Sequence, residues 1–517
     1  MSGKSLVLVA AASIGLSLSA AGSMPAAPSR EDCQARDNDT QSRLLECITQ
    51  QDLWSHLKVF QSIADQNPGA DGHGNRDTGT SGYRASVDYV AKLMRGAGYK
   101  ITIQSYIWRH FDLLRRPVLE TAGKAFVLSH DWFVARLSGS GSLTAMVEPV
   151  GRANPDKDAA SGCVRAEFAD FRRGHVALLE RGSCDYDIQV ANSEAAGASA
   201  VIIYNAAPSA GDVSRGNLDD GRAFEANLVE PASIPVIGVA SHAMGVELLR
   251  EYDAGTAPWV HLDVQSRHKS DVDYNVIADS PLGDPNNVVV LEGHLDAIYG
   301  AGMLDNASGS TTMIEIALDM AHTRTRHQLR YIWFGGEEIG LLGSKYYTRN
   351  LTRRQLHRIV FDIDADVTAT PNFTMYVADP AHAWDAKTFP KNVIPESRVG
   401  NRDFIDYFRD VGVVAYDANN DGTDSLSFSR VGVPNTGFYT NQDCCKKEWQ
   451  VKLWGGYLGD FEGVVPGWHE QCVDTPHRWC DNLPNNDPFV FELVSKAVAA
   501  VTLKLANDAS LDHEKRP

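Results

Sequence analysis

The sequence predicts an α/β fold with a mostly parallel or mixed central sheet, helices on both of its faces, and an inserted β-rich α+β domain. Two observations lead to this prediction. From Asp273 onwards, apolar β-branched runs alternate with amphipathic segments, which is the pattern of βα units. Across residues 128–264, short β-rich runs dominate instead. With 517 residues, 43% of them hydrophobic, the chain can bury a large core and more than one structural unit.

The N-terminus has the pattern of a secretory signal peptide. Lys4 precedes an apolar run over residues 6–18, and small residues follow at positions 19–21. This run is shorter than the roughly 18 residues that a membrane anchor needs. We therefore expect residues 1–21 to be a signal peptide cleaved after Ala21, and the protein to be secreted to the periplasm or the cell exterior. No later stretch is long and apolar enough to span a membrane.

Charge and cysteine content narrow the class further. The formal net charge is −18, so nothing indicates a nucleic-acid partner. Eight cysteines in an exported chain predict disulfides, and no CxxC pair indicates a cysteine-rich zinc site. Proximity in sequence proposes the pairs Cys33–Cys47, Cys163–Cys184 and Cys472–Cys480. Cys444 and Cys445 are adjacent, and they form either a vicinal bridge or separate bonds elsewhere.

The first structural unit begins after an N-terminal extension over residues 22–47. Apolar residues at helical spacing predict a helix over 53–66. A glycine-rich loop follows, and Ser81 can cap a second helix over about 82–95, which Gly96 and Gly98 end. The run over 101–108 then predicts a strand. This order of helix, glycine turn and strand is typical of the start of an α/β unit.

The middle region is expected to be a separate domain over residues 128–264. Its predicted elements are strands over 145–150, 175–179, 200–204 and 234–239 and a helix over 188–196. It contains no visible catalytic constellation. The catalytic unit would then be discontinuous, comprising residues 48–127 and 265–510.

In the second part of the catalytic unit, apolar strands end in polar clusters. A strand over 288–291 leads to His294, and a strand over 331–334 leads to Glu337 and Glu338. A predicted helix over 308–322 lies between them, preceded by a glycine-rich loop that contains Asp305. The remaining predicted elements are a strand over 359–367, a helix over 402–410, a strand over 432–439 and a closing helix over 489–505.

These clusters suit a zinc site at the carboxyl edge of a sheet, because imidazole and carboxylate groups are ligands of hydrolytic zinc. Each motif alone is weak. A His-Leu-Asp sequence is usually an ordinary surface pair, and two adjacent glutamates usually begin a solvated helix. The order is informative, because a solvated face does not predict that polar clusters repeatedly follow apolar strands.

In the order of these motifs, the chain resembles the secreted di-zinc exopeptidases, a family that includes leucyl aminopeptidases and glutamate carboxypeptidases. The matching blocks, in order, are GNRDTGTSGYRASVDYV, EGHLDA, GAGMLDNASGS, WFGGEEIGLLGSKYY, DVTATPN, TDSLSF and LWGG. In the middle region, GHVALLERGSCDYDIQVANSEAAGASAVIIYN is similar to the protease-associated (PA) domain. The resemblance implies the zinc exopeptidase fold, which is phosphorylase/hydrolase-like, with an inserted PA domain.

The resemblance also implies two zinc ions and their ligands. His294 and Asp366 would hold one zinc, Glu338 and His477 the other, and Asp305 would bridge them. Asp366 matches the family spacing D-x-x-x-x-P-N, with Asp362 and Asp364 as alternatives. His477 matches the family's His-x-x-Cys-Asp, with His469 as the rival.

Two further roles follow from the resemblance. Glu337 would be the general base for a water between the two zinc ions, passing the proton to the leaving amine. Asp296 would accept the second imidazole N–H of His294 and fix its tautomer, unless it is a simple turn residue.

The chain departs from the family pattern in two places. Pro476 stands where many relatives have a tyrosine that polarises the substrate carbonyl, and Cys472 is further from His477 than usual. Thr423-Asp424-Ser425 replaces a frequent Ser-Asp-His. Neither change removes a metal ligand, but both leave the oxyanion donor and the substrate preference open.

We therefore expect a secreted zinc-dependent exopeptidase that removes N-terminal residues from peptides. A carboxypeptidase or dipeptidase of the same fold is the main alternative. Glutaminyl cyclase is a further relative, although it uses one zinc and normally lacks the inserted domain. A binding protein that has lost catalysis predicts missing ligands, whereas this sequence contains every ligand type and the base. The inserted domain is expected to cover the cleft and limit substrate size.

Overall fold

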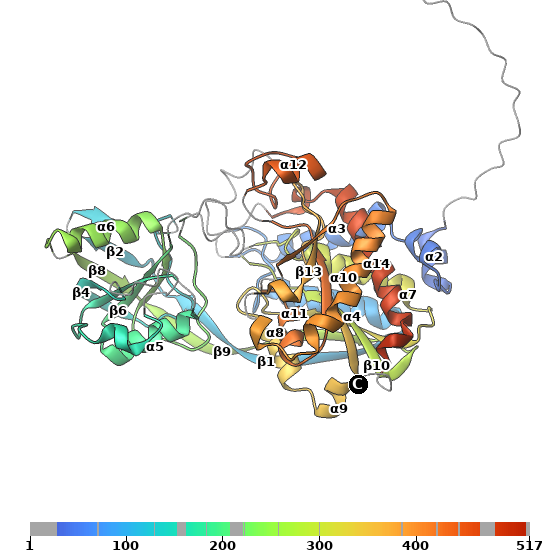
Figure 1. Cartoon of the computed structure of the whole chain (residues 1–517), viewed down its shortest axis with the longest axis horizontal. Helices are drawn as coiled ribbons and strands as arrows, with labels where there is room; N and C mark the ends of the chain where they lie inside the picture. The colour runs from blue at the N-terminus through green and yellow to red at the C-terminus, as the bar shows by residue number, and fades with distance from the viewer. Residues whose placement is uncertain are drawn as a thin grey trace, which may run out of the picture.

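The computed structural model describes residues 28–512, except 70–71, 122, 129, 152–161, 182–183, 207–220, 222, 257, 299, 384–385, 420–421, 443–444 and 466–480. The predicted signal peptide and the Cys472–Cys480 pair lie outside these residues. Figure 1 shows two lobes joined by the long antiparallel strands β1 (Lys100–Leu113) and β9 (Ser266–Asp279). Among the described residues, no helix is long and apolar enough to cross a membrane.

The larger lobe is built on an eight-stranded sheet in the order β1-β9-β11-β10-β12-β15-β13-β14. Four neighbouring strands at its centre run parallel: β11 (His327–Phe334), β10 (Asp284–His294), β12 (Ile359–Ala365) and β15 (Asn435–Tyr439). Antiparallel pairs join β9 to β11 and β15 to β13 (Tyr376–Asp379), and β14 (Tyr416–Asn419) lies parallel to β13. The predicted mixed α/β class is confirmed.

Helices cover both faces of this sheet, which explains why β10 reads as a continuous apolar run. Val289 and Leu291 belong to the core that contains the long helices, whereas Val288 and Val290 face a second, smaller core. The first group of helices is α3 (Gln50–Gln66), α4 (Ser81–Gly96), α7 (Ala307–Met320), α10 (Val393–Asp410) and α14 (Pro488–Asn507). The second group is α8 (Leu342–Arg349), α9 (Arg353–Arg358) and α11 (Ser425–Arg430). Every residue of α7 is buried, so this helix lies inside the lobe.

The smaller lobe has a seven-stranded sheet in the order β3-β2-β8-β4-β5-β6-β7. Its strands are β2 (Val118–Thr121), β3 (Lys124–Ala125), β4 (Gly141–Pro149), β5 (Val176–Glu180), β6 (Ala200–Tyr204), β7 (Val236–Ala240) and β8 (Trp259–Val264). Two helices, α5 (Tyr186–Ala196) and α6 (His242–Asp253), share hydrophobic cores with its strands. The sheet begins at Val118, before the expected boundary at residue 128, because β2 pairs with β8 and β3 with β2.

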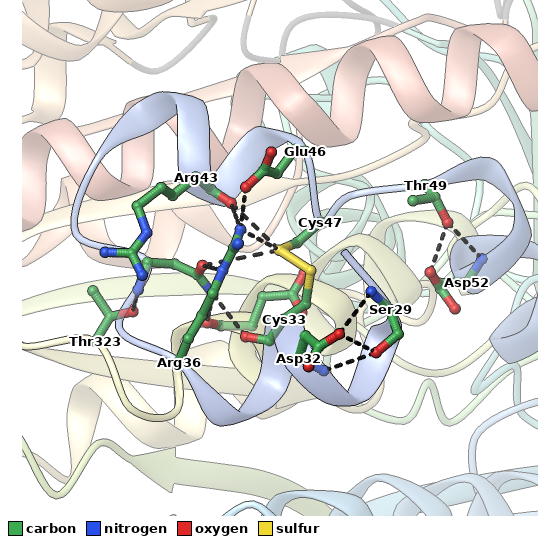
Figure 2. Close-up of a disulfide and its surroundings, with 12 residues drawn as sticks. Ser29, Asp32, Cys33, Arg36, Arg43, Glu46, Cys47, Thr49, Asp52 and Thr323 are labelled. Atoms are coloured by element: carbon green, nitrogen blue, oxygen red, sulfur yellow. Dashed lines mark hydrogen bonds and ion pairs between the residues drawn. A yellow bond between two sulfur atoms is a disulfide. The ribbon is translucent and has the colours of Figure 1, made fainter. Parts of the chain in front are cut away.

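A disulfide-bonded N-terminal segment packs against α7, and Figure 2 shows its disulfide. Its helices are α1 (Arg30–Ala35) and α2 (Gln41–Leu45), and Cys33 is bonded to Cys47. Asn38 donates from its backbone to Thr323 Oγ1 and from its side chain to the Asp319 carbonyl oxygen, at 3.0 and 2.6 Å. Arg30 pairs with the buried Glu315 at 3.1 Å. These contacts anchor residues 30–47 to α7 and to the turn that follows it.

Two of the predicted disulfides, Cys33–Cys47 and Cys163–Cys184, are confirmed. Cys445 is also disulfide-bonded, whereas Cys444 lies outside the described part of the chain.

Candidate metal centre

The predicted ligands converge because adjacent parallel strands end at the same edge of the larger sheet. His294 is the last residue of β10 and lies opposite Phe334, the last residue of β11. Glu337 and Glu338 follow β11, and Asp366 follows β12. The fourth approach comes from the loop before α7, which carries Asp305. In the first turn of α7, Ser310 Oγ donates to the His294 carbonyl oxygen at 2.6 Å.

The structure places three carboxylates around one imidazole nitrogen. His294 Nε2 lies 3.0 Å from Asp305 Oδ1, 3.4 Å from Asp366 Oδ1 and 3.9 Å from Glu337 Oε2. One ligand atom from each of His294, Asp305 and Glu338 lies within 4.8 Å of the others. His477 and its rival His469 are outside the described residues, so the fifth predicted ligand has no position here.

The electrostatics of this cluster fit a cation. His294 is 1% exposed, and one ring N–H cannot satisfy three carboxylates. Burial alone would lower the pKa of His294, but Asp366 and Glu337 raise it well above its usual range. For the carboxylates burial acts in the opposite direction: it raises the pKa values of Glu337 and Asp366, because it disfavours the charged form. Imidazole nitrogen with carboxylate oxygens is a donor set that hydrolytic zinc sites use, so these residues suit zinc.

Asp296 is more than a turn residue, although its contacts differ from those expected. The nearer acceptor for His294 Nδ1 is the backbone oxygen of Asp296 at 3.0 Å, whereas the Asp296 carboxylate is 3.6 Å away. The carboxylate accepts hydrogen bonds from Thr78 Oγ1 at 2.8 Å and from the Glu337 backbone N–H at 3.3 Å. The fully buried Asp296 thus links the ends of β10 and β11.

Two residues that the sequence analysis did not assign to the site hold Asp305. Asp481 accepts hydrogen bonds from the backbone N–H groups of Leu304 and Asp305, at 2.7 and 3.0 Å. Gln442 Nε2 donates to Asp305 Oδ2 at 2.8 Å. The sequence indicated Asp481 only as the end of the His-x-x-Cys-Asp pattern, and no pattern indicated Gln442.

A group of buried carboxylates lies beside the cluster, in β10 and β12 and at the start of α11. Its members are Glu292, Asp362, Asp364 and Asp424, all at most 3% exposed. Burial raises the pKa values of the first three well above their usual range and that of Asp424 to about 7. Asp362 and Asp364, the alternative ligands, lie within β12, whereas Asp366 is the aspartate that lies 3.4 Å from His294 Nε2.

The inserted domain reaches the edge of the site. Asn227 Nδ2 donates to the backbone oxygen of Glu338 at 3.3 Å. Asn227 forms an isolated β-bridge with Arg136, whose guanidinium lies over the Trp108 ring of β1, 5.0 Å from its centroid. The smaller lobe therefore contacts, through this hydrogen bond, the loop that carries Glu337 and Glu338.

Thr423-Asp424-Ser425, the segment that replaces the family's Ser-Asp-His, lies at the start of α11. Asp424 precedes the first residue of this helix, Ser425, and both are fully buried. Pro476, the other departure from the family pattern, is outside the described residues.

Comparison with known proteins places the chain among peptidases. Residues 275–499 match the model of peptidase family M28, and residues 141–248 match that of the PA domain. An aminopeptidase of Pseudomonas aeruginosa is 31% identical over 467 residues, which cover 88% of this chain and 81% of the relative. A probable leucine aminopeptidase 2 of Aspergillus oryzae is 30% identical over 353 residues, covering 68% of this chain and 66% of the relative.

Solved structures share the fold. An aminopeptidase from Aneurinibacillus sp. strain AM-1 aligns with a TM-score of 0.68 at 20% identity, covering 92% of this chain and 98% of that one. A zinc aminopeptidase from Bacillus subtilis aligns with a TM-score of 0.57 at 20% identity, covering 90% and 96%.

Proposed function

Because the chain belongs to peptidase family M28, we propose that it is a zinc-dependent aminopeptidase that removes N-terminal residues from peptides. The family resemblance inferred from the sequence blocks is confirmed. The observation that best supports the activity is the convergence of Asp305, Asp366 and Glu337 on His294 Nε2, at the ends of parallel strands. The aminopeptidase names of the relatives favour action at the N-terminus.

We propose two zinc ions, although the converging atoms of His294, Asp305 and Glu338 account for only part of such a site. His294 and Asp366 would hold the first ion, Glu338 and His477 the second, and Asp305 would contact both. When bound, zinc would polarise the scissile carbonyl and make water acidic enough to attack at neutral pH.

Glu337 is the proposed general base. Its Oε2 lies 3.9 Å from His294 Nε2, so it faces the space that the ligands surround. Burial raises the pKa of Glu337, and nearby positive charge would lower it again, so its carboxylate can accept a proton near neutral pH. Glu337 would take a proton from the attacking water and pass it to the leaving amine. Asp296 holds Glu337 in place through its backbone N–H.

Export to an oxidising compartment is part of the proposal. The bonds Cys33–Cys47 and Cys163–Cys184 support it, because such bonds persist outside the reducing cytosol. The signal-peptide pattern over residues 1–21 agrees with it.

The test compares leucine p-nitroanilide with its N-acetylated form, with and without a zinc chelator. We expect cleavage of only the free-amine substrate, loss of this activity with chelator, and recovery when zinc is restored. No cleavage by a zinc-loaded enzyme would contradict the aminopeptidase proposal. N-acylated dipeptides with a free C-terminus would then test the carboxypeptidase alternative, and zinc binding without any hydrolysis would indicate a binding protein.

A further inference from the structure

A buried arginine far from the site in sequence holds the loop between two proposed ligands. Arg76 is fully buried, and its guanidinium donates to three backbone carbonyl oxygens of the segment between His294 and Asp305. The distances are 2.7 Å from Nε to Ala301, 2.9 Å from Nη1 to Leu295 and 2.9 Å from Nη2 to Gly302. Leu295 directly follows His294, and Gly302 comes shortly before Asp305.

The neighbours of Arg76 bind the same loop. The backbone N–H of Arg76 donates to the Gly300 oxygen at 2.8 Å, and the Arg76 oxygen accepts from the Ala297 N–H at 3.3 Å. Asp77 Oδ1 accepts from the Gly300 N–H at 3.0 Å. With Thr78 bonded to Asp296, three consecutive residues contact the loop that follows His294.

The charge of Arg76 is also retained at this position. Burial lowers the pKa of Arg76 to about 10, and Asp481, Asp296 and Asp77 act in the opposite direction, so the guanidinium stays protonated at neutral pH. Its Cζ lies over the Phe60 ring, 4.9 Å from the ring centroid, a cation–π contact. A planar group with five N–H donors can bind three differently directed carbonyls, whereas a lysine ammonium cannot reproduce this fork.

We infer that Arg76 is a positioning residue of the zinc site, which sets the affinity for zinc by fixing the loop between His294 and Asp305. His294 is held by strand β10, and the Asp305 backbone is held by Asp481. The intervening loop sets where these two ligands stand relative to each other. The inference rests on the proposed function, because it takes His294 and Asp305 as ligands.

The test measures zinc affinity of the full-length protein carrying Arg76→Lys by competition with a chromogenic chelator. We expect affinity to fall about 10–100-fold, the range seen when groups that orient metal ligands are removed. Hydrogen exchange in the metal-free protein should rise at residues 295–304. Unchanged zinc affinity in a folded Arg76→Lys protein, with equal loss of thermal stability in its metal-free and zinc-loaded forms, would overturn the inference.

Arg330→Lys is the matched control. Arg330 is partly buried, and its guanidinium also makes three hydrogen bonds, to the Asp279 carboxylate at 2.6 and 3.1 Å and to the Tyr347 hydroxyl at 2.9 Å, away from the metal loop. It should keep its zinc affinity, and an equal loss in both variants would contradict a specific role for Arg76. If Arg76→Lys does not fold, Asp77→Ala removes one bond to the same loop and should weaken zinc binding several-fold; unchanged binding there would also overturn the inference.

A His294→Ala variant separates failure of the inference from failure of the proposed site. If that variant retains both zinc ions with parental affinity, the ligand assignment is wrong. If it loses zinc while Arg76→Lys does not, only the role of Arg76 is wrong. Neither result depends on whether the parent cleaves leucine p-nitroanilide.

Discussion

The two sheets of the molecule offer similar edges but very different side chains. In each, adjacent parallel strands end together: β10, β11 and β12 in the larger lobe, and β5, β6 and β7 in the smaller lobe. The first edge presents His294, Glu337 and Asp366, whereas β5 ends in the exposed Glu180 and β7 in a buried alanine. Parallel topology therefore supplies the place for a site, and the residue types at the strand ends supply the chemistry.

The interiors of the two sheets differ in the same direction. Strands β5 and β6 of the smaller sheet bury only hydrophobic residues, such as Leu178 and Ile202. The larger sheet buries Glu292 and Asp362, whose carboxylate oxygens have no hydrogen-bond partner among the described residues. Burying such groups without hydrogen bonds lowers the free energy of unfolding, so the larger sheet is destabilised beside its site.

The largest expected effect separates the strand-end glutamates. Glu337→Gln should lower kcat about 10²–10⁴-fold, the usual contribution of a general base, while the neutral amide retains the shape of the side chain. Glu180→Gln, at the end of β5, should leave kcat unchanged. Steady-state kinetics with leucine p-nitroanilide, with zinc content measured in parallel, checks both.

Parental activity of Glu337→Gln with full zinc content would contradict the assignment of Glu337 as the general base. The proton would then be accepted elsewhere, and the buried carboxylates beside the site would be the next groups to replace.

The two disulfides allow the stabilities of the two lobes to be compared, because Cys33–Cys47 lies in the larger lobe and Cys163–Cys184 in the smaller one. Cys33–Cys47 and Cys163–Cys184 are separated by 14 and 21 residues, so each bond should contribute about 3 kcal/mol to the free energy of unfolding. Replacing both members of the first pair by alanine should speed hydrogen exchange in α7, which the N-terminal segment contacts through Asn38. Replacing the second pair should leave α7 protected. The same exchange pattern in both variants would contradict this assignment.

Asp362→Asn tests the electrostatic cost within the larger sheet. Burial holds the pKa of Asp362 well above its usual range, whereas in the unfolded chain it is about 4. Between these values the folded protein retains a proton that the unfolded chain has lost. Rising pH therefore lowers the free energy of unfolding, by about 1.4 kcal/mol per pH unit from this group. The asparagine variant should show a shallower decline than the parent.

Urea unfolding of the metal-free protein at pH 5, 6 and 7 measures this slope. Parallel slopes for Asp362→Asn and the parent would mean that Asp362 titrates alike in both states and that burial imposes no such penalty.

The sequence predicted the features that local patterns encode. Apolar runs followed by polar clusters indicated where the strands end. The structure places His294, Asp305, Glu338 and Asp366 close together, as that pattern led us to expect. The start of the smaller sheet was not predicted, because β2 is recognisable as its member only through pairing with β8. Arg76 and Gln442 were missed for a related reason. Each reaches the site from more than 100 residues away. Arg76 lies in the matching block GNRDTGTSGYRASVDYV, but nothing in that block indicates a contact with the loop after His294.

The smallest expected effect lies where the two lobes meet. Asn227→Ala removes the hydrogen bond to the Glu338 oxygen, which should contribute about 0.5–1.5 kcal/mol and thus change kcat/KM about two- to tenfold. Asn192→Ala is the matched control, because Asn192 Nδ2 donates to the Gly162 oxygen at 2.9 Å wholly within the smaller lobe. If the inserted domain limits substrate size, the Asn227 variant should gain activity on long peptides relative to leucine p-nitroanilide. Identical kinetics in both variants on both substrates would mean that the smaller lobe affects neither the ligand loop nor access to it.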